Sequence, residues 1–151
     1  MDGFGIFAIF SFLFIIAIFA LVIVVYVYNA KWHVKIFEYL EYSNPWLGWI
    51  PFACQYALSD IACEAEGATI FGTHFDKKLF NFWYVITTGI GMIPAIGSIA
   101  SLVLNIVCGG YCYARIYAKI YEGTPEQYDT EGKLAGFIPI IAAMKFKKFY
   151  S

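Results

Sequence analysis

The chain has 151 residues, of which 61% are hydrophobic and 21% are aromatic, while only 14% carry a charge. This composition excludes an ordinary soluble domain of this length and predicts a single membrane domain over residues 1–151. The formal net charge of −1 provides no electrostatic basis for binding nucleic acid.

The first segment contains no charged residue over residues 3–30. A helix of that length exceeds what is needed to cross the hydrocarbon core of a bilayer. A signal peptide would have a basic start and a shorter apolar region, whereas this segment follows Asp2 and extends past Tyr26. We therefore predict a transmembrane helix over residues 4–28 that is kept as an anchor.

Two shorter elements follow. Residues 31–42 place charged side chains on one side of a helix and apolar ones on the other, which predicts an amphipathic helix lying in the membrane interface. Asn44 followed by Pro45 is typical of a helix start. It opens a predicted short kinked helix over residues 45–63, which either crosses the membrane or re-enters it, because its uncharged stretch is of borderline length.

A second long uncharged run covers residues 79–114 and contains Pro94. One straight helix of that length would be roughly 54 Å long, more than a single crossing needs, so the run must tilt, kink or fold back. We expect one long kinked helix over residues 79–121. The last apolar stretch is too short to cross and predicts a short re-entrant or interfacial helix over residues 134–150.

A GxIP pattern occurs three times in the chain. A proline inside a helix leaves a backbone carbonyl without its partner, and in lipid that carbonyl must face protein, water or an ion. The pattern is typical either of broken helices around a polar site, as in transporters, or of kinks satisfied by neighbouring helices, and we expect the kinks. The residues of this helix-breaking repeat are Gly48, Pro51, Gly91, Pro94, Gly136 and Pro139.

Small and polar residues recur within the long uncharged run. Small residues permit close helix approach, and polar ones need partners away from lipid. The predicted helix-packing or pore-lining residues are Thr87, Thr88, Gly97, Ser98, Ser101 and Asn105. Aromatic and basic residues near the ends of the predicted spans are typical of membrane-interface anchors. These are Trp32, Lys35, Trp46, Arg115 and Lys119.

The sequence contains no catalytic motif and no zinc-ligand spacing, so we expect no enzymatic activity, no cofactor and no metal site. Cys108 and Cys112 are expected to be buried, inert thiols because they lie in an apolar run. Cys54 and Cys63 form a disulfide only if their loop faces an oxidising compartment, and the sequence leaves that open.

Basic residues follow the first predicted helix instead of preceding it, which predicts an N-terminus outside and a cytoplasmic C-terminus. Two topologies satisfy this rule. Three crossings leave Lys77 and Lys78 outside, whereas a single crossing with later segments that fold back keeps every basic residue inside. We expect an all-α integral membrane protein with about three transmembrane helices plus interfacial or re-entrant helices.

The stretches IFEYLEYSNPWLGWIPFACQYAL and IGMIPAIGSIASLVLNIV resemble a family of small, uncharacterised bacterial multi-span membrane proteins with repeated Ile-Pro helices. The resemblance covers roughly residues 32–119. It implies an architecture and a bacterial cell membrane, and it implies no activity or site residue.

We expect a non-catalytic membrane protein that acts as a subunit or scaffold of a membrane complex or homo-oligomer. Its partners would be the lipid bilayer and either copies of itself or other membrane subunits. The alternative is a pore former, holin-like or a small channel, and a transporter component ranks third.

Overall fold

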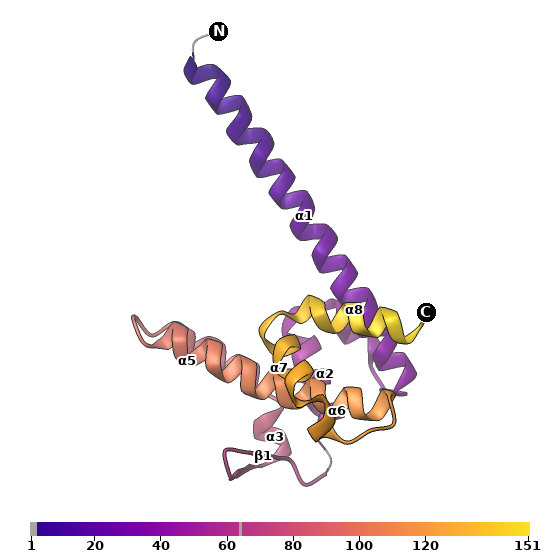
Figure 1. Cartoon of the computed structure of the whole chain (residues 1–151). Helices are drawn as coiled ribbons and strands as arrows, with labels where there is room; N and C mark the ends of the chain where they lie inside the picture. The colour runs from indigo at the N-terminus through magenta and orange to yellow at the C-terminus, as the bar shows by residue number, and fades with distance from the viewer. Residues whose placement is uncertain (1–2, 64) are drawn as a thin grey trace.

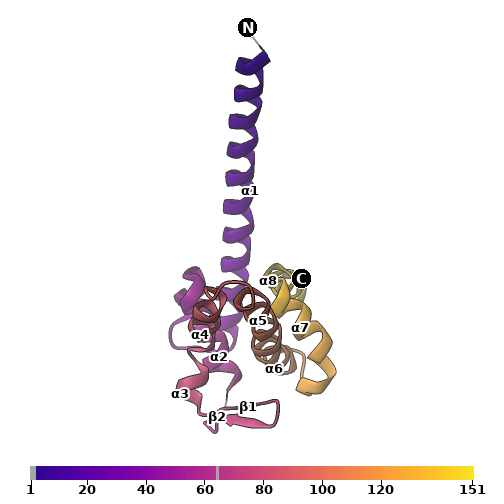
Figure 2. The same cartoon turned by 90° about the vertical axis from the view of Figure 1, so that its left-hand side faces the viewer.

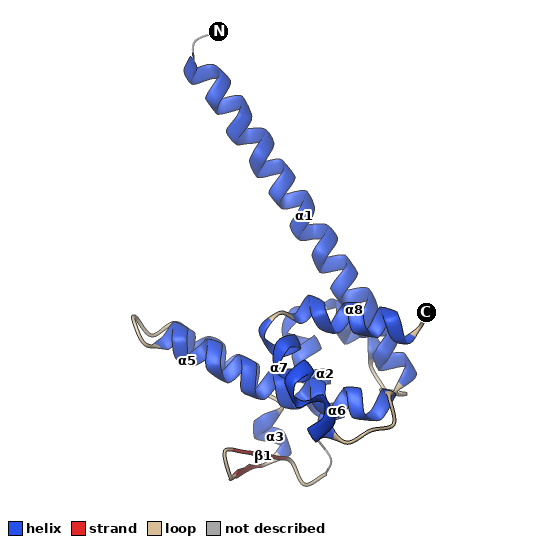
Figure 3. Cartoon of the chain, viewed as in Figure 1, coloured by secondary structure: helices blue, strands red, loops and turns tan. Residues whose placement is uncertain are grey.

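The computed structural model describes residues 3–63 and 65–151, so Asp2 lies outside the described part. The chain is mostly helical, which agrees with the all-α prediction (Figure 3). Two helices, Gly5–Tyr39 and Gly97–Ile120, are long and apolar enough to cross a membrane. The elements in chain order are α1 (Gly3–Tyr39), the 3₁₀ helix η1 (Pro45–Trp49), α2 (Pro51–Ala62), β1 (Ala68–Ile70), β2 (Thr73–Phe75), α3 (Lys77–Phe80), α4 (Trp83–Gly91), α5 (Gly97–Leu104), the π-helical turn η2 (Asn105–Gly109), α6 (Gly110–Ile120), the 3₁₀ helix η3 (Pro125–Tyr128), α7 (Asp129–Phe137) and α8 (Pro139–Phe149).

α1 is one uninterrupted helix, as predicted for residues 4–28, but it continues to Tyr39. The prediction of a separate interfacial helix over residues 31–42 is therefore wrong. Residues 6–40 contain no glycine or proline that would interrupt α1. The helix ends where Glu41 adopts a φ of 54° and the Tyr42 N–H donates to the Phe37 carbonyl at 2.9 Å. This is a Schellman-type ending without the usual glycine.

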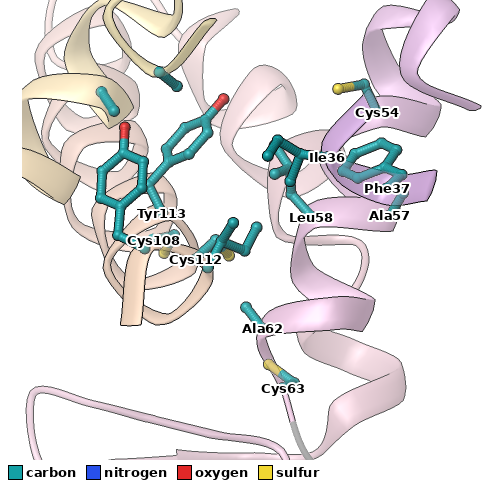
Figure 4. Close-up of a cluster of buried hydrophobic side chains, with 14 of the residues drawn as sticks. Ile36, Phe37, Cys54, Ala57, Leu58, Ala62, Cys63, Cys108, Cys112 and Tyr113 are labelled. Atoms are coloured by element: carbon teal, nitrogen blue, oxygen red, sulfur yellow. The ribbon is translucent and has the colours of Figure 1, made fainter. Parts of the chain in front are cut away.

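The last turns of α1 are buried in a small helical body. Ile36 and Phe37 of α1, Leu58 of α2 and Phe146 of α8 are fully buried, and Figure 4 shows Ile36 and Phe37 beside Leu58. Each such side chain contributes about 1.5–3 kcal/mol relative to exposure. α1 is thus held by the body at one end and bare along the rest of its length.

The predicted kinked helix over residues 45–63 is divided at Ile50 into η1 and α2. α2 has 12 residues, or about 18 Å, which is shorter than the hydrocarbon core of a bilayer. Its inner face packs into the body, where Ala57 and Ala62 are fully buried. α2 by itself is therefore too short to cross a bilayer.

The long helix expected over residues 79–121 does not form, because the run folds back on itself. α4 and α5 form a helical hairpin whose turn holds Pro94, and α5 then continues through η2 into α6. Proline cannot continue a helix, and Ala95 adopts a φ of 66°, which reverses the chain. The turn carries Met92 and Ile96, which are 83% and 76% exposed.

The three GxIP repeats have a common structural role. Their glycines lie where two segments approach closely: a Cβ at Gly48 would lie 2.9 Å from the Val34 N, and one at Gly91 would lie 3.2 Å from the Ser101 side chain. Pro51 and Pro139 are the first residues of α2 and α8, and Pro94 lies in the turn between α4 and α5. All three prolines therefore lie at breaks between helices, and none forms the expected kink inside a continuous helix.

The expected short helix over residues 134–150 is instead the end of α7 and the whole of α8, separated by the extended residue Ile138. A residue before proline disfavours the α conformation, which explains the break. Lys145 of α8 forms an ion pair with Glu131 of α7. Its Nζ also lies 4.3 Å from the ring centroid of Tyr117 and 4.8 Å from that of Tyr128, so a cation–π cluster holds α8 against α6.

α6 and α7 are in direct backbone contact. A Cβ at Gly132 would lie 2.5 Å from the Gly110 carbonyl oxygen and 2.8 Å from the Ala114 N, and one at Gly136 would lie 2.7 Å from the Gly110 N. Glycines four residues apart form a groove that lets two helices approach this closely. Gly132 and Gly136 have this spacing, and only Gly136 was expected to be important, as part of the GxIP repeat.

The exposed part of α1 and the α4–α5 hairpin project from the same side of the body, toward the upper left of Figure 1. The β1–β2 hairpin, in which Ala68 pairs with Phe75, lies at the opposite end (Figure 2). The molecule therefore has one face from which two apolar elements extend and another that carries the short strands.

We predict that Gly132→Ala destabilises the protein by about 2 kcal/mol, because the added methyl group has no space against the backbone of α6. Gly89→Ala is the matched control, since a Cβ at Gly89 meets nothing within 4 Å. Alanine at an open helical position is expected to be neutral or slightly stabilising. Thermal unfolding in mild detergent measures both, and equal melting temperatures for the two variants would contradict the packing argument.

Candidate functional site

His33 is the most deeply buried polar residue of α1, with 0% exposure. Its Nδ1 lies 2.8 Å from the Asn29 carbonyl oxygen and its Nε2 lies 2.9 Å from the Tyr113 hydroxyl. A neutral imidazole satisfies both contacts, because Nδ1–H donates to the carbonyl while Nε2 accepts from the hydroxyl. His33 thereby ties α1 to α6.

A cavity of about 210 Å³ lies beside this contact, at the base of the α4–α5 hairpin. Five parts of the chain form it: α2, the α4–α5 hairpin, η2, the start of α6, and the corner between α7 and α8. The lining residues are Gln55, Trp83, Tyr84, Leu102, Asn105, Gly109, Tyr113, Gly136, Phe137 and Pro139.

The polar lining of the cavity is uncharged. Asn105 opens the π-helical turn η2, and its Oδ1 lies 3.1 Å from the Thr87 hydroxyl on the facing helix. Trp83 is 5% exposed, and its Nε1–H has no hydrogen-bond partner among the described residues. Single π turns occur frequently at functional sites. This cavity is therefore the best candidate site in the part of the chain that the structure describes.

The predicted packing or pore-lining residues divide into two groups. Thr87 and Gly97 are buried, and Ser101 is partly buried, so these residues and Asn105 hold the hairpin together. Thr88 and Ser98 are exposed, and the Thr88 hydroxyl donates to the Tyr84 carbonyl of its own helix at 2.7 Å. The polar residues of the run thus find most of their partners inside the same chain.

The predicted interface anchors also divide. Trp32 and Lys35 contact Tyr150 of α8, with a ring-centroid distance of 6.1 Å for Trp32 and an Nζ-to-centroid distance of 5.5 Å for Lys35. These contacts lie where α1 enters the body. Trp46 is 56% exposed on η1.

Arg115 and Lys119, by contrast, lie on α6 and bind within the body. The Arg115 guanidinium stacks over the Tyr111 ring at 4.4 Å, and the Lys119 Nζ donates to the Ile61 carbonyl at 2.7 Å. Lys119 therefore ties α6 to α2, whereas Arg115 packs on its own helix.

Asp60 forms a second polar cluster, at the end of α2. Its carboxylate lies 3.1 Å from each of three groups: the Tyr42 hydroxyl, the Asn81 side-chain amide and the Lys77 Nζ. Burial alone would raise the pKa of Asp60, but the hydrogen bonds from these three groups and the charge of Lys77 hold it below its ordinary value. A carboxylate so fully bonded is suited to a structural role.

All four cysteines are free and buried. Cys54 and Cys63 lie at opposite ends of α2 (Figure 4). A disulfide between them was one of the two states that the sequence left open. Burial raises the pKa of Cys54 to about 12 and that of Cys63 to about 11, so neither is a reactive thiolate at neutral pH. Among the described residues, no group of three or more His, Cys, Asp or Glu side chains is placed to hold a metal ion.

Sequence reasoning missed Trp83 and Gln55 as lining residues of the cavity. Neither lies in a recognisable motif, and only the fold brings α2 next to α4 and η2. For Gly132 a signal existed, because its spacing from Gly136 matches the glycine pattern of closely packed helices.

We predict that Asp60→Asn lowers the melting temperature at neutral pH and that its difference from the wild type shrinks as the pH falls below 3.8, the ordinary pKa of the group. A carboxyl whose pKa is lower in the folded state stabilises the fold above its unfolded pKa, and this stabilisation is lost as the pH falls through the folded value. Thermal unfolding between neutral and acidic pH measures the effect. Glu122→Gln, at an exposed residue, is the control, and a pH-independent difference for Asp60→Asn would contradict the prediction.

Comparison of the chain with models of protein families, with curated proteins and with solved structures finds no match. The resemblance noted over roughly residues 32–119 therefore stays a prediction. Any functional conclusion must come from the geometry of the chain itself.

Proposed function

We propose that this protein is a non-catalytic integral membrane protein that crosses the bilayer once through α1 and acts as a subunit or scaffold of a membrane complex or homo-oligomer. The observation that carries this proposal is the bare, apolar part of α1. Large apolar side chains there are widely exposed, including Phe7 at 71%, Phe14 at 67% and Phe19 at 66%. Water would make such a surface strongly unfavourable, whereas lipid or a neighbouring helix would cover it.

The α4–α5 hairpin supports a re-entrant segment in the same bilayer. α4 has 9 residues and α5 has 8, so each is about 12–14 Å long, less than half of a hydrocarbon core of roughly 30 Å. The helix Gly97–Ile120 is long enough to cross, but its second half, from Cys108 onward, is largely buried in the body. Only the hairpin is then left to enter lipid.

The distribution of charge supports one crossing in place of the three that the sequence favoured. All 10 Lys and Arg residues lie between Lys31 and Lys148, and the segments proposed to contact lipid, residues 5–28 and 82–104, hold none of them. A cytoplasmic body with an external N-terminus satisfies the positive-inside rule without exception. Lys77 and Lys78 then stay with the body.

A subunit or scaffold role fits the polar contacts better than a pore. Thr87 and Asn105, which would have lined a pore, face each other inside the hairpin at 3.1 Å. The buried His33 and the partly buried Asp60 have partners that tie elements of the body together. What this chain offers to a partner is an apolar helix on a stable body.

We predict that the hairpin tip does not cross the membrane. In intact cells, a membrane-impermeant maleimide should label neither Met92→Cys in the tip nor Thr124→Cys in the body, since we place one in lipid and the other in the cytoplasm. Permeabilisation should expose Thr124→Cys, and Met92→Cys should react only after detergent is added. Labelling of Met92→Cys from outside intact cells would contradict a single crossing and favour three.

We also predict that one face of α1 contacts protein. A photoreactive amino acid placed in turn at Leu13, Phe14, Ile15 and Ile16 samples the whole circumference, because successive residues are about 100° apart. Irradiation of native membranes should yield protein adducts at one or two of the four positions. Adducts to lipid alone at all four positions would contradict the subunit proposal while leaving the membrane anchor intact.

A further inference from the structure

α8 lies at the end of the body from which α1 projects, as both Figure 1 and Figure 2 show. Its inner side is buried, with Ala142, Ala143 and Phe146 at 0% exposure. Residues three and four apart share one side of a helix. The outward side of α8 therefore consists of Ile140, Met144, Lys147 and Lys148. This side is apolar toward the start of the helix and basic toward its end, which is typical of a helix that lies in a membrane interface.

Tyr150 joins the basic end of α8 to α1. Its hydroxyl donates to the Lys35 carbonyl at 2.7 Å, and its ring centroid lies 6.1 Å from that of Trp32. The Lys35 Nζ lies 5.5 Å from the centroid of the Tyr150 ring, and the Lys31 Nζ lies 5.7 Å from that of the Trp32 ring. Four lysines thus gather where α1 and α8 meet, and we call them the junction lysines. They are Lys31, Lys35, Lys147 and Lys148.

The junction lysines form no ion pair with any of the described residues. Lys77, Lys133 and Lys145, in other parts of the body, each have a carboxylate partner. Glu38 lies one helical turn beyond Lys35, on the side away from the proposed span, and brings one negative charge near four positive ones. Since the whole chain has a formal net charge of −1, this excess of positive charge is local.

The position of the junction lysines matches the headgroup region of a bilayer. Lys31 follows the proposed membrane-spanning residues 5–28 by three positions. Lysine side chains at the end of a span extend toward the lipid headgroups. At the other end of α8, Phe137 and Ile138 are 50% and 42% exposed, and Met144 is 59% exposed. This end of the body therefore presents apolar groups and cations together.

We propose that the junction lysines bind the phosphate of an anionic glycerophospholipid, while Ile140 and Met144 enter the boundary between its headgroup and its acyl chains. An anionic membrane surface attracts each nearby lysine by about 1 kcal/mol, which is about fivefold in affinity. A zwitterionic lipid carries the same phosphate, but its own cation cancels the net attraction. The proposal rests on the crossing proposed for α1, and it adds a selectivity for lipid charge that a plain anchor would lack.

The test compares two lipids on the full-length protein in mild detergent. Native mass spectrometry is used to titrate the protein with dioleoyl-phosphatidylglycerol and with dioleoyl-phosphatidylcholine, which differ in charge and share their acyl chains. We expect the anionic lipid to bind about twentyfold more tightly, because two lysines in contact contribute about fivefold each. Glycerol 3-phosphate, which has a phosphate without acyl chains, should not displace it at the same concentration. Displacement would identify a site for a soluble phosphate and overturn the lipid site.

Lys147→Gln and Lys148→Gln should each lower the preference for the anionic lipid about fivefold. Lys78→Gln is the matched control, because it removes the same charge from an exposed residue of α3, which lies near the β1–β2 hairpin and away from α8 (Figure 2). Met144→Gln should weaken both lipids equally and leave their ratio unchanged, because it removes apolar contact alone. Equal binding of the two lipids by the wild type, or equal losses in Lys148→Gln and Lys78→Gln, would overturn the proposal.

The two proposals fail in different ways. A protein that resists carbonate extraction from membranes but binds both lipids equally keeps its anchor and loses the lipid site. A protein released by carbonate loses both.

Discussion

The close approach of α6 and α7 is the constraint on which the other features depend. Gly132 and Gly136 bring the two backbones into contact at Gly110, and α7 ends just after this contact, where Ile138 precedes Pro139 of α8. The same region contains η2, from which the α4–α5 hairpin extends, and Gly109 and Gly136 both line the cavity at its base. A single methyl group at Gly132 would push against backbone, which cannot rotate away as a side chain can.

Burial of polar groups explains why the long apolar run folds back. A straight helix through Pro94 would leave an unpaired carbonyl and would expose Thr87 and Asn105 to lipid, where an unpartnered polar group is costly. In the hairpin, these two side chains lie 3.1 Å apart, and the Ile90 carbonyl accepts from the Ile93 N–H at 3.0 Å. Thr87 and Asn105 thereby find within the same chain the partners away from lipid that their polar side chains need.

Features encoded locally could be predicted from the sequence. The unbroken helix over residues 4–28 follows from an unbroken apolar stretch, and the helix breaks at Pro51, Pro94 and Pro139 follow from the missing N–H of proline. The continuation of α1 to Tyr39, the hairpin and the cavity could not be predicted in this way, because they depend on contacts between distant residues. His33 shows the difference. The charged and apolar residues around it predicted an interfacial helix, whereas its hydrogen-bond partner is Tyr113, 80 residues further along the chain.

Residues 6–40 contain neither glycine nor proline, which makes α1 a stiff, straight helix. Transmembrane helices tilt by about 20° on average, and they tilt more in thinner bilayers. The last turns of α1 are fixed in the body through Ile36 and Phe37. If α1 crosses the bilayer and the hairpin enters it, as proposed, a change of tilt would rotate the body as a unit and alter the depth of the tip at Met92 and Ile96. Bilayer thickness would then be coupled mechanically to the depth of the hairpin.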